Sequence, residues 1–182
     1  SLVGHYSLIL GLIIGLIIFY FSFKNFKNSN LLDTKIISFT FLQLFFVFIS
    51  FLCLIFSFIV SDFSNETVFN NSHTTKPLFY KISGTWGNHE GSLLLWLLVL
   101  TLFILLFLIN TKNQPTKYKI LTLVFQQIII IGFFVFLIKT SNPFNYLYPI
   151  PEEGLGLNPI LQDPALAIHP PILYLGYVGS SI

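Results

Sequence analysis

The chain has 182 residues, of which 54% are hydrophobic and only 9% are charged, and its mean hydropathy is +0.81. A soluble domain carries about 25% charged residues, so this composition excludes a soluble globular enzyme and a disordered protein. The net charge of +2 is too small for a nucleic-acid-binding surface, and the single cysteine, Cys53, excludes a disulfide framework. We therefore expect an all-α, polytopic membrane protein.

Four segments are long and apolar enough to cross a bilayer as helices, which takes about 20 residues each. In chain order they are residues 2–23, 36–61, 92–109 and 120–138. A fifth apolar run begins at residue 171 and is too short for a crossing when the chain stops at residue 182. The sequence thus predicts four transmembrane helices plus the start of a fifth. They form a single membrane domain that is a fragment of a longer protein, a split-gene product or part of a chain.

The lysines indicate which connections share a side of the membrane. The two short loops hold six lysines and one aspartate, whereas the long loops, 61–91 and 139–171, hold three lysines and six acidic residues. Because lysine-rich loops stay on the cytoplasmic or matrix side, we expect the N-terminus and both long loops to lie outside, in the periplasm or intermembrane space. The absence of arginine and the abundance of Phe, Ile and Asn suggest an AT-rich organellar genome and the mitochondrial inner membrane, with the bacterial plasma membrane as the alternative.

The first stretch that could carry chemistry reads Gly-Thr-Trp-Gly-Asn-His-Glu-Gly-Ser over residues 84–92, where a long loop meets the third helix. We expect Ser92 to cap this helix and Glu90 to complement its positive end. His89 and Glu90 could instead hold the charged groups of a ligand, with Trp86 at the membrane interface. The residues leave both interpretations open.

The second stretch contains His169, which Pro170 and Pro171 follow. Proline keeps the residue before it extended and is favoured at the first position of a helix. We therefore expect His169 just before the fifth helix, at the outer face, where the helix dipole favours the neutral imidazole that a metal needs. One histidine suits haem iron, which takes one or two axial ligands, but a purely structural role stays open.

Polar and small residues inside the predicted spans should mark contacts between helices. Gln126 and Gln127 lie in the middle of the fourth span, where amides usually form hydrogen bonds between helices. Gly11 and Gly15 form a Gly-x-x-x-Gly pair in the first span, which favours a close helix contact.

The motifs together resemble the N-terminal part of the CcmF family, the integral-membrane component of the cytochrome c haem lyase in system I cytochrome c maturation. The resemblance rests on residues 85–96, 141–144, 157–164 and 169–179, in this order and spacing. It implies a protein that receives haem from a haem chaperone. With its partners, such a protein joins the haem vinyl groups to two thiols of apocytochrome c on the outer face.

The resemblance also implies site residues and partners. It makes His169 an axial ligand of the haem iron and leaves Trp86, His89 and Glu90 without a firm role. The implied partners are the remaining CcmF segments or chains, the haem chaperone, the apocytochrome c chaperone and apocytochrome c.

The chain also departs from the family pattern. The Trp-rich haem-handling motif is absent, since Trp86 and Trp96 are the only tryptophans, and the second outer-face histidine is missing. One hypothesis is therefore a haem lyase subunit that other segments complete. The alternative is a non-catalytic, CcmF-derived structural subunit of a larger inner-membrane respiratory assembly.

Overall fold

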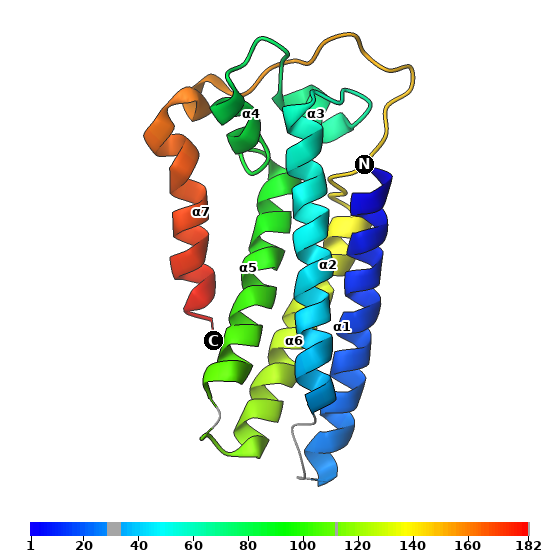
Figure 1. Ribbon diagram of the computed structural model, residues 1–182, viewed down its shortest axis with the longest axis vertical. Coiled ribbons are helices and arrows are strands. Elements are labelled where there is room, and N and C mark those ends of the chain that lie inside the picture. Colours follow the sequence, from blue (N-terminus) through cyan, green and yellow to red (C-terminus); the bar gives the residue numbers. More distant parts are fainter. Residues whose placement is uncertain (29–33, 112, 182) are drawn as a thin grey trace.

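The computed structural model describes residues 1–28, 34–111 and 113–181, and the regular structure of this part consists of helices and one isolated β-bridge. Four long helices form an antiparallel bundle (Figure 1): α1 (Leu2–Asn28), α2 (Thr34–Ile59), α5 (His89–Asn110) and α6 (Thr116–Lys139). Each of them is long and apolar enough to cross a membrane. The protein is thus an all-α multi-pass membrane protein, as its composition predicts.

The two long connections contain helices of their own. The first holds α3 (Glu66–Asn71) and α4 (Leu78–Gly84), and the second leads through a short 3-10 helix (Pro159–Gln162) into α7 (Pro164–Gly179). Both connections and the N-terminus lie at one end of the bundle, at the top of Figure 1, while α1 and α5 end, and α2 and α6 begin, at the other end. The residues that resemble functional motifs are therefore gathered at a single end.

The fifth helix begins earlier in the structure than its prolines suggest. Asp163 caps it, because its carboxylate accepts hydrogen bonds from the backbone amides of Ala165 and Leu166, and Pro164 occupies the first helical position. An aspartate cap followed by proline is a strong helix start. Pro170 and Pro171 consequently lie inside α7 and not at its beginning.

The bundle is most tightly packed where α1, α2 and α6 meet. A Cβ atom added to Gly15 would lie 2.6 Å from Nε2 of Gln43, so the Gln43 side chain packs directly against the α1 backbone at this glycine. The Gln127 amide donates a 2.9 Å hydrogen bond to Oε1 of Gln43 in the same buried region. Gln126 donates instead to the carbonyl oxygen of Ser181, at 2.7 Å. The interhelical roles that the sequence predicts for Gly15 and Gln127 are confirmed.

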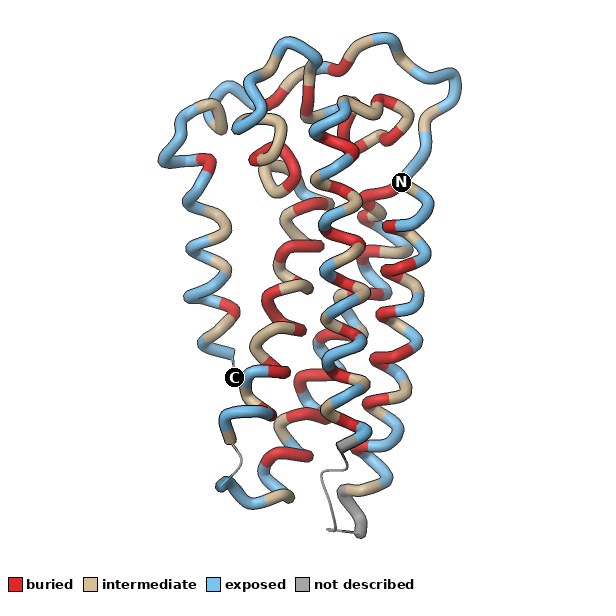
Figure 2. Tube along the Cα trace, viewed as in Figure 1, coloured by how far each residue is buried: buried red, intermediate tan, exposed pale blue. Residues whose placement is uncertain are grey.

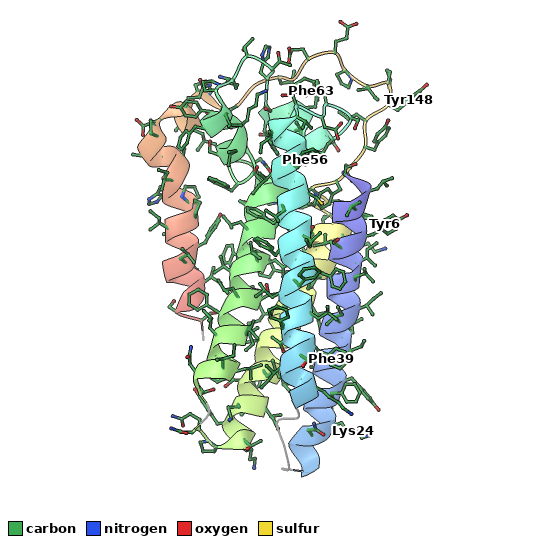
Figure 3. All side chains as sticks on the ribbon, in the orientation of Figure 1. Tyr6, Lys24, Phe39, Phe56, Phe63 and Tyr148 are labelled. Atoms are coloured by element: carbon green, nitrogen blue, oxygen red, sulfur yellow. The ribbon has the colours of Figure 1, made fainter. Side chains whose placement is uncertain are left out.

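The outer surface of the bundle is apolar, and Figure 2 shows exposed residues alternating with buried ones along every long helix. Figure 3 shows side chains such as Tyr6 and Phe56 pointing away from the bundle, and these two are 61% and 64% exposed. Such a surface suits lipid or further protein rather than water.

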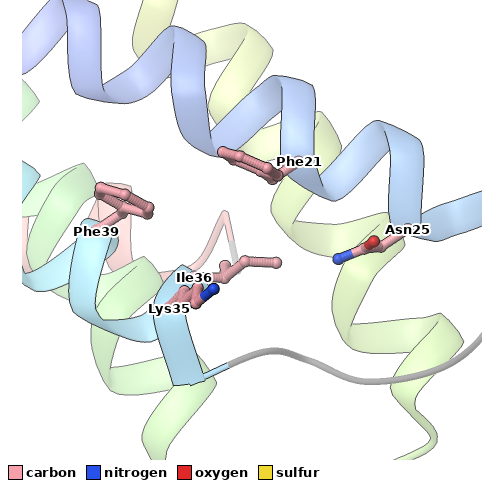
Figure 4. A pocket seen from close by; sticks show the side chains of 5 residues that line it. All are labelled: Phe21, Asn25, Lys35, Ile36 and Phe39. Atoms are coloured by element: carbon pink, nitrogen blue, oxygen red, sulfur yellow. The ribbon is translucent and has the colours of Figure 1, made fainter.

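A small cavity lies between α1 and α2, near the end of α1 and the start of α2 and remote from the motifs (Figure 4). It is lined by Phe21, Asn25, Lys35, Ile36 and Phe39.

Candidate functional site

The turn between α4 and α5 is built by a single asparagine. Oδ1 of Asn88 accepts a 2.7 Å hydrogen bond from the Gly91 amide and so caps α5, while its Nδ2 donates to the carbonyl oxygen of Gly84 at 2.6 Å. Ser92 does not cap the helix as we expected, because it lies within the first turn and its hydroxyl donates to the carbonyl oxygen of His89. The cap lies four residues earlier.

Gly91 is essential to this turn. A Cβ atom at Gly91 would overlap the carbonyl oxygen of Thr85, which is a backbone atom and cannot move aside. Glycine therefore lets the start of α5 lie directly against the end of α4. Together with the hydrogen bonds of Asn88, this contact fixes the backbone on both sides of Trp86.

Trp86 connects the two sequence motifs. Its indole Nε1 donates a 2.8 Å hydrogen bond to the carbonyl oxygen of Ala167, 81 residues further along the chain. Ala167 is buried and belongs to the second turn of α7. The tryptophan of the first motif thus contacts the backbone of the helix that carries the histidine of the second.

His169 lies within α7, as its sixth residue, and not in front of the helix as we expected. The expectation was wrong because Asp163 and Pro164 start the helix one and a half turns earlier. A helix dipole acts mainly within the first turn, so its influence on the imidazole is weaker than the sequence suggested.

The imidazole of His169 is exposed and has no hydrogen-bond partner within the described part of the chain. Ala167, Tyr174 and Val178 recur at helical spacing and pack α7 toward the bundle. His169 is two residues from Ala167, about 200° around the helix, so it lies on the face opposite the bundle. Ile172 shares this outer face and is 63% exposed.

Aromatic contacts hold the middle of α7 against the bundle. The ring of Trp96 on α5 stacks on Tyr174 with centroids 5.4 Å apart, and it meets Tyr177 edge to face at 6.2 Å. It also lies 5.4 Å from the ring of Phe133 on α6. The two tryptophans of the chain therefore both anchor α7, Trp86 near its beginning and Trp96 near its middle.

His89 and Glu90 face away from this junction. Nε2 of His89 forms a 3.1 Å hydrogen bond with Oγ of Ser141, and its ring lies edge to face with Phe136. Glu90 lines a polar cavity of about 190 Å³ together with Glu66 and residues of the segment that follows α6. Within the described residues, no hydrogen bond or ion pair joins His89 or Glu90 to His169. Of the three candidates Trp86, His89 and Glu90, Trp86 is the one that forms a hydrogen bond with the histidine-bearing helix in the described part of the chain.

The two long connections bind each other above the bundle. Asn65 caps α3 and also donates a 2.9 Å hydrogen bond to the carbonyl oxygen of Pro143. Further out, the backbone amide and the hydroxyl of Thr74 both donate to the Glu153 carboxylate, at 3.0 and 2.5 Å. These hydrogen bonds lower the pKa of Glu153 from 4.5 to about 2. The second connection is therefore fastened as a strap across the first.

Sequence reasoning missed three contributors to this end of the molecule: the Asn88 cap, the Ser141 hydroxyl and the Ala167 carbonyl oxygen. The cap had a sequence signal, since asparagine is a favoured N-cap. The described residues contain no group of three or more His, Cys, Asp or Glu side chains that could hold a metal ion. His169 remains the side chain with an unengaged imidazole at this end of α7.

Comparison with known proteins places these features in a family. The family model described as cytochrome C assembly protein matches residues 86–182. The cytochrome c-type biogenesis protein CycK of Rhizobium meliloti is 53% identical over 133 residues, which are 73% of this chain and 20% of CycK. The CycK protein of Bradyrhizobium diazoefficiens is 45% identical over 183 residues, covering 98% of this chain and 27% of the relative.

A solved structure is also similar to this chain. The cytochrome c haem lyase CcmF has a TM-score of 0.82 and 26% sequence identity, and the match covers 100% of this chain and 28% of that one. The chain thus spans about a fifth to a little over a quarter of the length of the proteins it matches.

Proposed function

Because this chain belongs to the cytochrome C assembly protein family, we propose that it is a subunit of a membrane haem lyase that binds haem through His169. The observation that carries this proposal is an exposed imidazole without a hydrogen-bond partner among the described residues, on a helix whose position is fixed from the opposite side. The relatives bear names of cytochrome c biogenesis proteins and a haem lyase, and we extend that activity to this chain.

The outer face of α7 has a surface that suits haem. Its exposed residues next to His169 are apolar, with Ile172 63% and Leu173 50% exposed. Gly176 lies two turns further along this face, and a Cβ atom added there would meet nothing within 4 Å. A flat, largely apolar group can therefore approach the helix closely below the imidazole. Bound there, haem would supply the vinyl groups that become linked to the thiols of apocytochrome c.

The roles of the chain's own residues follow from this placement. His169 would hold the iron as one axial ligand, and Ile172 and Leu173 would exclude water from one side of the ring. The bundle behind α7 would provide a rigid support. A second axial ligand and the site for apocytochrome c would come from the remaining segments of the lyase, which accounts for the single histidine on α7.

We assign this end of the bundle to the outer side of the membrane. The N-terminus and both long connections lie at this end (Figure 1), and the opposite connections are rich in lysine. An amino-acid composition of the kind that AT-rich genes encode favours the mitochondrial inner membrane, with the site in the intermembrane space. The haem chaperone and apocytochrome c would then reach α7 from that space.

The test is the haem absorption spectrum of the native complex that contains this chain, recorded with and without the substitution His169→Ala. We expect the variant to lose bound haem and mature cytochrome c while the complex still assembles. Added imidazole should restore part of the haem absorption, because the substitution leaves open space on an exposed face.

His89→Ala is the matched control, since this histidine lies at the same end of the bundle but points toward Ser141. We expect this variant to keep its haem. If His169→Ala also keeps its haem and yields mature cytochrome c, the chain is a structural subunit and the lyase proposal fails.

A further inference from the structure

The two prolines in α7 leave one carbonyl group without any helical donor. In a helix, a carbonyl oxygen accepts from the amide four residues later or, in a tighter turn, three residues later. For Ala167 these positions are Pro171 and Pro170, and neither has an N–H group. The carbonyl oxygens of Leu166 and Ile168 each lose only one of their two potential donors. Ala167 is thus the residue at which the helix cannot satisfy its own backbone.

This carbonyl group is also shielded from water. Ala167 is only 2% exposed, and it lies on the side of α7 that faces the bundle. A buried backbone acceptor without a donor costs about 1–3 kcal/mol. The hydrogen bond from Trp86, at 2.8 Å, meets this need at the one position where it arises.

The donor is held as firmly as the acceptor. The amide of Trp86 itself donates to the carbonyl oxygen of Ser83, and Asn88 binds the carbonyl oxygens of Gly84 and Thr85 on the preceding residues. Gly91 brings the start of α5 against the same turn. The segment from residue 84 to 92 therefore builds a rigid support, and the indole N–H is the group that it presents to α7.

We propose that Trp86 is a positioning residue for His169: its indole N–H replaces the backbone donors that the two prolines remove and fixes the turn of α7 that carries the imidazole. The haem-related part of this inference rests on the proposed function. The hydrogen bond is two residues away from His169 and lies on the opposite face of the same turn. It holds that turn without occupying the side on which a ligand would bind.

The hydrogen bond between Trp86 and Ala167 also limits bending of α7 at its two prolines. A helix interrupted by two prolines can bend or twist at the interruption, because fewer backbone hydrogen bonds resist the motion. A donor from α4–α5 couples the first turns of α7 to the bundle at this weak point. Trp96 and Tyr174 secure the helix beyond it, so the imidazole lies between two anchors.

The test is a double-substitution cycle that combines Trp86→Phe with Pro171→Ala. Phenylalanine keeps an aromatic ring but has no N–H, whereas alanine at position 171 restores the backbone amide that can donate to Ala167. The readout is amide hydrogen exchange in peptides covering residues 164–174, measured on the native complex in detergent. Trp86→Phe alone should speed exchange there about tenfold, because a buried acceptor loses its donor.

The second substitution should remove this effect. In the Pro171→Ala background, Trp86→Phe should change the exchange rate by less than about twofold, because the helix then satisfies Ala167 itself. The inference is overturned if Trp86→Phe speeds exchange equally in both backgrounds, since the indole would then act by packing alone. It is also overturned if Trp86→Phe leaves the exchange unchanged.

Trp96→Phe is the matched control, because it makes the same chemical change at the other tryptophan. The indole N–H of Trp96 donates to no group in the described residues, and phenylalanine keeps a ring against Tyr174. We expect no faster exchange at residues 164–171 in this variant.

The haem spectrum of the same variants tests the link to His169. Trp86→Phe should lower haem occupancy and shift the Soret band, and Pro171→Ala should restore both. If His169→Ala loses haem but Trp86→Phe does not alter occupancy or spectrum, the positioning role is overturned while the proposed function stands. If His169→Ala itself keeps haem, the proposed function fails, and the exchange measurements alone then report whether the indole replaces the missing donor.

Discussion

The contact of α1 with α2 and α6 and the contact of α7 with the α4–α5 region join helices in opposite ways. In the first, side chains of α2 and α6 pack against two glycines of α1, and two glutamine side chains form hydrogen bonds with each other in the interior. In the second, aromatic rings pack against an exposed helix and one side chain binds a backbone carbonyl oxygen. In the first contact the two amides bind each other, whereas the second contact holds α7 from one side only.

This difference suggests separate roles for the two contacts: the first supports the bundle, and the second positions the helix that carries His169. The Gln43 and Gln127 amides of the α1–α2–α6 contact bind each other in the interior, so this pair supports the packing of the bundle. The α7 contact fixes a helix from behind and leaves His169 free on the other face. The long motifs of the sequence lie around this second contact, where the position of α7 and the accessibility of the His169 imidazole both matter for binding.

The largest expected effect comes from Gly91→Ala, which attacks the second contact alone. A Cβ atom would overlap the Thr85 carbonyl oxygen, and overpacking against backbone costs about 3 kcal/mol. The α4–α5 turn should distort, and α7 should become sensitive to protease while the four long helices persist. Gly132→Ala is the control, because its Cβ atom would meet nothing within 4 Å. Equal protease resistance of the two variants would contradict the assigned role of the turn.

The next largest effect should come from Gln127→Leu, which breaks the first contact. Gln43 would lose its 2.9 Å partner in a buried site, which costs about 1–2 kcal/mol and should lower the thermal unfolding midpoint in detergent. The double variant Gln43→Leu/Gln127→Leu should recover part of the loss, because no polar group is then left without a partner. If the double variant is less stable than either single one, the amide pair does not explain the contact.

A smaller effect is expected from Tyr174→Leu, which keeps an apolar side chain but removes the ring that stacks on Trp96. Such aromatic pairs contribute about 1 kcal/mol. Hydrogen exchange in the second half of α7 should rise, whereas exchange in the α1–α2–α6 contact should not. Tyr148→Leu serves as the control, because Tyr148 is 88% exposed. A rise that extends to α1 would show that the two contacts are not independent.

The smallest effect concerns the strap above both contacts. The pKa of Glu153 lies at about 2 in the folded chain, below its ordinary 4.5, because Thr74 donates hydrogen bonds to the carboxylate. A lowered pKa stabilises the strap above pH 4.5, and this contribution disappears as the pH falls from 4.5 toward 2. Proteolysis of the strap by an acid-active protease should therefore increase over this range. Glu153→Gln should abolish the pH dependence, and an unchanged profile in that variant would refute the assignment.

The sequence predicts the bundle well and the site only in part. Long apolar runs determine the four spanning helices, since a bilayer leaves few alternatives to a helix. The start of α7 was misplaced because two later prolines looked like a helix beginning, while Asp163 and Pro164 formed a better one. Local signals compete in such cases, and tertiary contacts decide among them.

The bond between Trp86 and Ala167 could not be predicted from spacing, because it joins a side chain to a backbone atom 81 residues away. A partial signal was nevertheless present. Two consecutive prolines inside a helix leave one carbonyl oxygen without a donor, so some other segment has to supply an N–H group. The sequence thus revealed the need, and only the structure identified Trp86 as the group that meets it.

The two prolines also bear on the order in which the protein is made. Translation proceeds from the N-terminus, so the α4–α5 turn leaves the ribosome before α7 does and can be in place when the prolines emerge. The later helix then completes its backbone bonding by docking onto a segment that is already formed. The docked position of α7 thus depends on a turn that the ribosome has already released, because the Trp86 indole supplies the donor that the prolines lack.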